Sequence, residues 1–244
     1  MKNYLYWFNQ YAWYDKIFIY DKDDFNYDEW DIIKDWENLF LVLWKEISFS
    51  ENYNTIYNKT TDFSIIEEWL LKKETINIIN RMVYEWYTSY KNVIKLFCNP
   101  EIEKLLIKKP QKISKKIWEC HLWKHCIESK KGEQKLVIVP DIRSYNNIVE
   151  QSKFKWIFLY SLDTQNKKDS NRWKMKTWEE SLIVSTSSEI FQDYNNLKEI
   201  IFIEPQKWYY ESQQDPRYKI ETVIKKLWEE YNTKIKIIES EEIF

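Results

Sequence analysis

The chain has 244 residues, a formal net charge of −2, 44% hydrophobic residues and 31% charged residues. This composition is typical of a folded globular protein, and it excludes a disordered chain and a strongly basic, nonspecific nucleic-acid binder. No apolar run reaches the length of a membrane span, and no secretory hydrophobic core follows the N terminus, so we expect a cytoplasmic protein with no membrane partner. Three cysteines in a chain of this length do not indicate a disulfide framework.

Glycine and tryptophan usage is unusual. The sequence holds 1 glycine and 14 tryptophans, whereas average usage predicts glycine at roughly 7% of positions. Several tryptophans stand where a turn glycine would be natural, among them Trp30, Trp156, Trp178 and Trp228. Because genetic codes differ at UGA, we hypothesise that a codon translated here as tryptophan is glycine in the source organism. If tryptophan is real, these turns lack the positive-φ freedom of glycine.

Tandem mass spectrometry of the native peptide that spans Trp178 tests this hypothesis. We expect a residue of glycine mass at that position, because the segment before Ser181–Val184 reads as a turn into a strand. An indole-sized residue in the native peptide contradicts the hypothesis.

The first predicted domain, residues 1–65, is a small β domain. Tyr14–Tyr20 ends in β-branched and aromatic residues and predicts a strand, and the polar stretch Asp21–Tyr27 follows as a turn. Asp31–Ile33 and Leu39–Leu43 are apolar runs typical of strands.

Residues 66–110 predict a helical linker. Across Lys73–Leu96 apolar residues recur at three- and four-residue steps, which is the pattern of an amphipathic helix: Ile76, Ile79, Val83, Trp86 and Tyr90. Asn99-Pro100 ends this helix, because the residue before proline disfavours the helical region.

The segment Lys112–Lys131 holds candidate phosphate and metal ligands. Ser114, Lys115 and Lys116 form either a basic helix start that attracts a phosphate or a solvated basic turn. Cys120–Cys126 contains both histidines and two of the three cysteines. On a helix His121 and His125 are one turn apart and share a face, so they are weak candidates for Zn²⁺ ligands; a half-buried helix face is the alternative.

Residues 111–244 form the predicted second domain, which carries four short apolar runs bounded by polar residues: Lys135–Val139, Trp156–Tyr160, Ser181–Val184 and Ile200–Ile203. Continuous apolarity predicts buried strands of a parallel sheet that is covered on both faces. The intervening segments are long enough for helices, for instance Tyr145–Ser152 and Ile220–Tyr231. The fold class is therefore α/β, and ligands are expected at the carboxyl ends of the strands.

Four segments of this domain resemble the primosomal replication-restart helicases (primosomal protein N′), a family of superfamily 2 DNA helicases. Val137–Ile142 is similar to the family motif LVPEI, and Val184–Phe191 is similar to GTRSALF. Ile203–Gln206 stands where the family has DEEH, and Tyr210–Tyr218 resembles YKQEEGPRY. Near the N terminus Tyr14–Tyr20 matches the family segment LDRTFDY.

The resemblance implies an architecture and an activity. Residues 1–65 would be a 3′-end DNA-binding β domain, 66–110 a linker or abbreviated winged helix, and 111–244 one RecA-like lobe of the P-loop NTPase fold. The family unwinds DNA 3′→5′ with ATP and Mg²⁺ and acts in DNA replication restart. The implied partners are forked DNA with a single-stranded 3′ end, primosome proteins, or a second polypeptide that supplies the missing helicase lobe.

The resemblance also assigns roles to particular residues. Phe18 and Tyr20 would contact DNA; the alternative, which base rates favour, is that both are core or sheet-face aromatics. Glu204 would be the catalytic carboxylate. The degenerate nucleotide-binding positions are Ser114, Lys115, Lys116 and Glu119. Further positions that correspond to family motifs are Pro140, Asp141, Thr186, Ser188, Pro216, Arg217 and Tyr218.

Several departures from the family pattern concern the chemistry. Ile203 replaces the aspartate that holds Mg²⁺, and an isoleucine cannot bind a hard cation. Ser187 stands at the arginine position of GTRSA, and Ile19 replaces the acidic residue between Phe18 and Tyr20. No glycine-rich phosphate loop precedes Lys135. We therefore expect the chain alone not to hydrolyse ATP efficiently.

Two other functions remain open. Arg81-Met82-Val83 and Val139–Arg143 resemble pieces of nucleoside or deoxynucleotide monophosphate kinases on a P-loop fold. Phosphoryl transfer to a deoxynucleotide would favour that alternative. A non-enzymatic interaction protein that keeps the fold is the third possibility, and absence of DNA binding would favour it.

Overall fold

The protein is a mixed α/β chain that divides into two compact units. The computed structural model describes residues 2–7, 17–21, 31–34, 39–45, 55–56, 64–67, 71–86, 88–97, 118–122, 125–129, 132–141, 143, 157–176, 182–205, 210–212 and 216–239. The first unit comprises Met1–Lys72 and Ser89–Lys108, and the second comprises Lys73–Thr88 and Lys109–Phe244.

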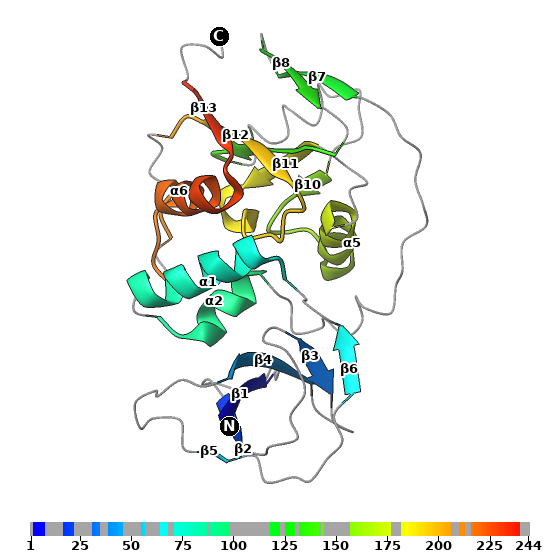
Figure 1. Cartoon of the computed structure of the whole chain (residues 1–244). Helices are drawn as coiled ribbons and strands as arrows, with labels where there is room; N and C mark the ends of the chain where they lie inside the picture. Colours follow the sequence, from blue (N-terminus) through cyan, green and yellow to red (C-terminus); the bar gives the residue numbers. More distant parts are fainter. Residues whose placement is uncertain are drawn as a thin grey trace. The chain divides into compact units, whose positions relative to one another are not determined.

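The first unit contains a six-stranded sheet in the order β5-β2-β1-β4-β3-β6 (Figure 1). Its strands are β1 Lys2–Trp7, β2 Ile17–Asp21, β3 Ile32–Lys34, β4 Leu39–Lys45, β5 Thr55–Ile56 and β6 Ser64–Glu67. Neighbouring strands are antiparallel apart from the β2–β5 pair, which is parallel. The predicted strands at Tyr14–Tyr20, Asp31–Ile33 and Leu39–Leu43 correspond to β2, β3 and β4.

The single helix predicted over Lys73–Leu96 is in fact two helices, α1 Lys73–Trp86 and α2 Tyr90–Phe97. Ser89 explains the new start, because its Oγ accepts a hydrogen bond from the Asn92 backbone N–H at 3.3 Å. A serine at this position caps a helix N terminus and satisfies a backbone donor that would otherwise lack a partner. The apolar periodicity runs through the break, and so it did not reveal the cap.

The second unit is built on an all-parallel, five-stranded sheet in the order β10-β11-β9-β12-β13. Its strands are β9 Gln134–Val139, β10 Ile157–Leu159, β11 Leu182–Thr186, β12 Leu197–Ile203 and β13 Lys234–Ile238. The predicted α/β class with a parallel sheet is confirmed, and four of the five strands match predicted runs. The fifth, β13, was not predicted as a strand.

Alternate residues of these strands form a core cluster on one face of the sheet. Its members are Val137, Val139, Leu182, Val184, Ile201, Ile203 and Ile238, all of them buried. The intervening residues of β9, β11 and β12 are buried too. Burial on both faces explains why these strands are continuous apolar runs.

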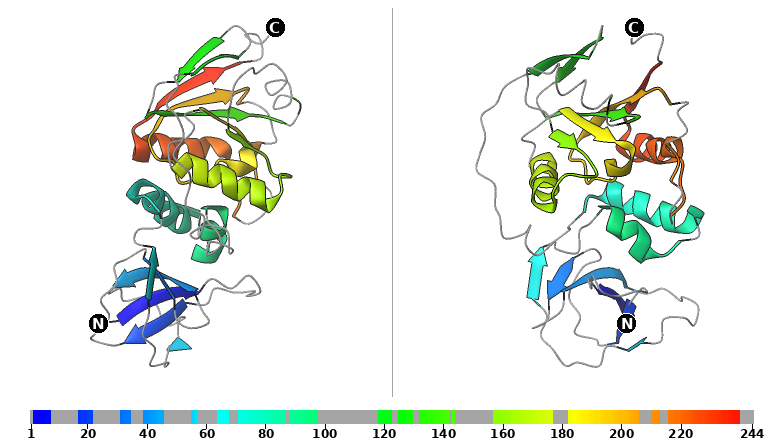
Figure 2. Two further views of the ribbon diagram at one scale, coloured as in Figure 1. Left: turned by 90° about the vertical axis from the view of Figure 1, so that its right-hand side faces the viewer. Right: turned by 180° about the vertical axis from the view of Figure 1, so that it is seen from behind.

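Helices α5 Gln165–Lys176 and α6 Ile220–Tyr231 lie along one face of this sheet (Figure 2). α6 is the helix predicted over the same residues, whereas the predicted helix Tyr145–Ser152 lies outside the described residues. Asn232 ends α6 in the left-handed conformation with φ 51°, and its N–H donates to the Trp228 carbonyl. An asparagine can adopt this conformation at a helix C terminus in place of glycine.

Helix α1 packs on α6 through a buried polar contact. Thr75 Oγ1 donates to Asp193 Oδ1 at 2.7 Å and lies 2.7 Å from Tyr231 Oη. Burial raises the pKa of Tyr231 well above its usual value, and the nearby Asp193 carboxylate adds to the shift. The Tyr231 hydroxyl therefore stays protonated, and this contact joins α1, the segment after β11 and the end of α6.

A row of charges continues the same interface toward the C terminus of α1. Arg81 pairs with Glu229 at 2.7 Å and with Glu230 at 3.2 Å, both on α6. Lys226 Nζ donates to Glu85 Oε2, and only 4% of the Lys226 side chain is exposed. Because α1 is fixed to α6 by these pairs, it is part of the second unit.

Candidate functional site

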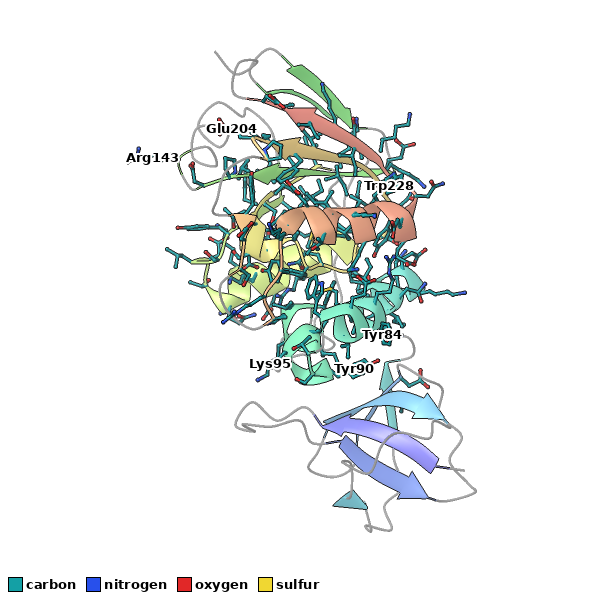
Figure 3. All side chains as sticks on the ribbon, turned by 90° about the vertical axis from the view of Figure 1, so that its left-hand side faces the viewer. Tyr84, Tyr90, Lys95, Arg143, Glu204 and Trp228 are labelled. Carbon is teal, nitrogen blue, oxygen red and sulfur yellow. The ribbon has the colours of Figure 1, made fainter. Side chains whose placement is uncertain are left out.

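The carboxyl ends of the three central strands place several candidate residues at one edge of the sheet. β9 pairs with β11 up to Val139 opposite Thr186, and with β12 up to Ile138 opposite Phe202. Asp141 therefore follows the central strand, with the ends of β11 and β12 on either side. Figure 3 shows Arg143 and Glu204 at this same end of the sheet. Parallel sheets bind ligands at this edge.

Glu204 follows β12 directly and has an unusual backbone. Its φ is 47°, in the left-handed region that is uncommon for residues other than glycine. The Glu204 N–H donates to the Ile238 carbonyl of β13 at 2.8 Å, which holds this conformation. The preceding residue, Ile203, is fully buried in the sheet core. Ile203, where the resemblance would place a metal-binding aspartate, is therefore a core residue in this chain.

Thr186 and Ser188 lie where β11 ends. Thr186 is the buried last residue of the strand, and a short 3₁₀ turn, Ser187–Glu189, follows it. The hydroxyl oxygens of Thr186 and Ser188 lie 3.5 Å apart. Lys168 of α5 pairs with Glu189 at 2.8 Å, so the turn is fixed to a helix. The edge therefore offers hydroxyl groups next to a paired cation and carboxylate.

Tyr218 connects this edge to α1. Its ring stacks on Trp86 with a centroid distance of 5.5 Å and meets Phe191 edge-on at 5.0 Å. Its carbonyl accepts the Ser212 N–H at 2.8 Å. Burial raises the pKa of Tyr218 to about 12; a hydrogen bond with Ser212 opposes the shift and the charge of Glu189 adds to it. The contact with Trp86 could not be read from the sequence.

The neighbours of Tyr218 differ in exposure. Pro216 is buried and Arg217 is exposed. Lys219 forms an ion pair with Glu211 at 2.8 Å, and the backbones of these two residues form a β-bridge. The two ends of the segment that resembles YKQEEGPRY are therefore held together, by the Glu211–Lys219 bridge and by the Ser212–Tyr218 hydrogen bond. Tyr218 is a packing residue of this segment.

Two substitutions of Tyr218 separate the contribution of its ring to stability from the contribution of its hydroxyl group. Tyr218→Ala removes a ring held between two aromatic rings and is expected to lower the free energy of unfolding by about 3 kcal/mol. Tyr218→Phe keeps the ring and is expected to cost about 1 kcal/mol, the usual net contribution of one hydrogen bond. Urea denaturation of both variants gives the comparison, and equal losses for the two would contradict it.

The same raised pKa fixes a pH dependence. The pKa of Tyr218 is about 12 in the folded protein, against about 10 in an unfolded chain. Its contribution to stability is complete below pH ~10 and is lost as the pH rises toward 12. The Tyr218→Phe variant should accordingly lose less stability than the wild type between these pH values.

Other candidate residues belong to other elements or lie outside the described residues. Phe18 and Tyr20 are alternate residues of β2 in the first unit, at register positions opposite Leu5 and Asn3. Ser114, Lys115 and Lys116 lie outside the described residues, so their predicted phosphate role stays a prediction. Glu119 lies on the strand β7, Trp118–Leu122, in the second unit.

The helix predicted around the histidines is wrong. Residues Trp118–Leu122 and His125–Ser129 are two antiparallel strands, β7 and β8, which pair with each other. In their register His121 lies opposite Cys126, and His125 lies opposite Leu122. Because side-chain positions alternate along a strand, the two histidines occupy opposite faces of this hairpin. The shared face predicted for His121 and His125 is therefore not formed.

Two general properties bear on the class of protein. Within the residues described with their side chains, no three His, Cys, Asp or Glu side chains gather as a metal site. None of the described helices combines the length and apolarity needed to cross a membrane.

The described residues form an α/β protein whose five-stranded parallel sheet carries polar groups at the carboxyl ends of its strands. Comparison with protein-family models gives no match for this chain, and comparison with curated proteins gives none either.

Proposed function

We propose that the chain is a DNA-binding protein related to the first lobe of the primosomal restart helicases, and that it acts in DNA replication restart without efficient ATP hydrolysis of its own. One observation carries this proposal. The three segments that resemble LVPEI, GTRSALF and DEEH begin in the last residues of β9, β11 and β12 and continue beyond them, and these strands are neighbours in the sheet. Segments far apart in the chain thus meet at one edge.

This adjacency supports a RecA-like lobe. In such a lobe the loops after the parallel strands contact nucleotide or nucleic acid, because the carboxyl edge is where ligands bind. Asp141, Ser188 and Glu204 all follow the ends of these strands. The resemblance assigns functional positions to the same three loops.

The burial of Ile203 supports the second part of the proposal. Hydrolysis in this class of motor needs a carboxylate that holds Mg²⁺ at the end of the strand before Glu204. The residue there is apolar and has no exposed surface. Glu204 supplies the carboxylate that orients water in this class of motor, but the carboxylate that binds Mg²⁺ is missing. A second polypeptide would have to complete any catalytic centre.

One of the two segments behind the kinase alternative, Arg81-Met82-Val83, lies on α1 at its contact with α6. Arg81 is engaged by Glu229 and Glu230 across the α1–α6 interface, and by Glu85 within α1. These carboxylates raise the pKa of Arg81 and occupy its guanidinium. The Arg81 guanidinium therefore has a structural role in the contact between α1 and α6.

Substitutions in β2 test the DNA-binding part. The double variant Phe18→Leu, Tyr20→Leu removes two rings and keeps apolar side chains. If these rings stack on bases, loss of each costs about 1–3 kcal/mol, so the Kd for forked DNA with a free 3′ end should rise at least tenfold. Fluorescence anisotropy gives the Kd.

The matched control is Ile17→Val, Ile19→Val in the same strand, which should leave the Kd within about twofold. Far-UV circular dichroism verifies the fold of both variants. Wild-type affinity in the leucine variant would contradict the assignment of Phe18 and Tyr20 to DNA binding.

A further inference from the structure

The strand β13 forms one edge of the five-stranded parallel sheet. It pairs with β12 on one side, and no other described strand pairs with it (Figure 1). Four of its five residues, Lys234–Ile237, are exposed. A strand with an exposed edge presents backbone N–H and C=O groups that can pair with a strand of another chain.

The two faces of β13 differ in chemistry. Alternate residues of a strand lie on opposite faces, so Ile235 and Ile237 share one face, whereas Lys234 and Lys236 share the other. The side chains of Ile235 and Ile237 are 41% and 52% exposed. They lie beside the buried residues Ile200 and Phe202 of β12 in the sheet register. The apolar face of the sheet therefore continues onto β13, where a further strand would cover it.

We propose that the edge of β13 binds an extended segment of another protein in which acidic and apolar residues alternate. Backbone hydrogen bonds would add this segment to the sheet as a sixth strand, and alternate side chains would give specificity. Its acidic residues would lie beside Lys234 and Lys236, and its apolar residues beside Ile235 and Ile237. Opposite charges and apolar side chains that face each other across strands stabilise a sheet. This surface goes beyond the proposed function and does not depend on it.

The charges of β13 disfavour a second copy of the chain as the partner. Two β13 strands related by a twofold axis would pair antiparallel, with one residue opposite its own copy at the centre. The two registers that pair most of the exposed residues centre on Ile235 and on Lys236. The first places Lys234 opposite Lys236, and the second places Lys236 opposite its own copy. Like charges in these positions destabilise the pairing, whereas an acidic strand would be attracted.

Titration of the full chain with synthetic peptides tests the proposal. The probe is a capped, fluorescently labelled peptide of sequence Glu-Val-Glu-Val-Glu-Val, and anisotropy gives its Kd. One comparison peptide is Lys-Val-Lys-Val-Lys-Val. The other is the acidic peptide with a methyl group on every backbone nitrogen, which keeps the charges and blocks strand pairing. We expect the acidic peptide to bind at least about tenfold more tightly than either comparison.

Reversing the two lysine charges should exchange the preference between the peptides. Lys234→Glu, Lys236→Glu is expected to weaken binding of the acidic peptide at least about tenfold and to strengthen binding of the basic peptide by a similar factor. The matched control is Lys219→Glu, Lys225→Glu, which changes two exposed lysines outside β13 by the same net charge. It should leave both Kd values within about twofold.

A third variant removes the apolar surface of the strand. Ile235→Thr, Ile237→Thr keeps β-branched side chains that suit a strand, and it should weaken binding of the acidic peptide about tenfold. Circular dichroism verifies the fold of each variant, and analytical ultracentrifugation gives the oligomeric state. The proposal is overturned if the wild type does not bind the acidic peptide, if the methylated peptide binds as tightly, or if the charge-reversed variant keeps wild-type affinity. A wild-type dimer that the threonine variant abolishes would also overturn it, because the edge would then bind a second copy.

Discussion

Replacing Ile203 by aspartate is expected to unfold the second unit rather than to create a Mg²⁺ site. Ile203 has 0% exposed surface and belongs to the core cluster of the sheet. The change removes a buried aliphatic side chain and buries a carboxylate, so it should cost at least about 4 kcal/mol. Total stabilities are about 5–15 kcal/mol, and such a loss is therefore close to global unfolding.

The matched control for this variant is Ile203→Val, which should cost about 0.5–1.5 kcal/mol because it removes one methylene group. Urea denaturation measures both losses. ATP hydrolysis is measured in parallel with Mg²⁺ and forked DNA. A folded aspartate variant with wild-type stability and new Mg²⁺-dependent hydrolysis would contradict the assignment of position 203 to the core.

Neutralising Glu85 is expected to weaken the attachment of α1 to α6. Glu85→Gln leaves the Lys226 ammonium, whose side chain is 4% exposed, without its counter-charge. Breaking a buried pair costs about 3–5 kcal/mol, and the exposed position of Glu85 reduces this to about 2–3 kcal/mol. The free energy of unfolding from urea denaturation gives the loss.

Lys226→Met is the opposite case. It removes the buried charge and keeps an unbranched apolar chain, so it should change stability by less than about 1 kcal/mol. The double variant Glu85→Gln, Lys226→Met should be nearly as stable as Lys226→Met. A large loss in the methionine variant together with a small one in the glutamine variant would contradict this account of the pair.

The pH dependence of the pair follows from Glu85. The hydrogen bond with Lys226 lowers the pKa of Glu85 from its ordinary value. A carboxylate with a depressed folded-state pKa contributes stability that is complete above its unfolded pKa of about 4.3 and is lost as the pH falls through the folded value. Wild-type and Glu85→Gln stabilities should therefore converge at acidic pH.

The buried strands of the second unit could be predicted because their residues are almost all apolar. Lys135–Val139 and Ile200–Ile203 are continuous apolar runs, and such runs belong in a sheet covered on both faces. The strand β13 was not predicted, although the alternation of lysine and isoleucine in Lys234–Ile238 is a strand pattern. It lacks the continuous apolarity of the other four strands, and four of its five residues are exposed. Its pairing with β12 supplies the stability that its composition does not indicate.

The hairpin β7–β8 shows how one spacing can support two structures. His121 and His125 are four residues apart, which fits one face of a helix. The alternation Glu119, His121 and then Cys126, Glu128 fits two strands equally well, with its centre at Trp123-Lys124. The two segments form strands because they pair with each other. Sequence periodicity alone does not distinguish these strands from a helix.

The contacts that join α1 to the second unit could not be predicted for a different reason. Trp86 stacks on Tyr218, and Thr75 meets Asp193 and Tyr231, across long separations in the chain. Each residue by itself fits an amphipathic helix or a loop. Only the three-dimensional arrangement shows that the predicted linker contributes the helix α1 to the second unit, which holds the parallel sheet.

The most direct test of the central claim is an anisotropy titration of forked DNA carrying a free 3′ end. The wild-type chain is titrated at low and moderate salt, with and without a nonhydrolysable ATP analogue, and blunt duplex serves as the comparison. The proposal predicts salt-sensitive binding that prefers the fork and does not respond to the analogue. Absence of fork binding at low salt would contradict DNA binding and favour an interaction protein. A strong response to the analogue would contradict the loss of the nucleotide site.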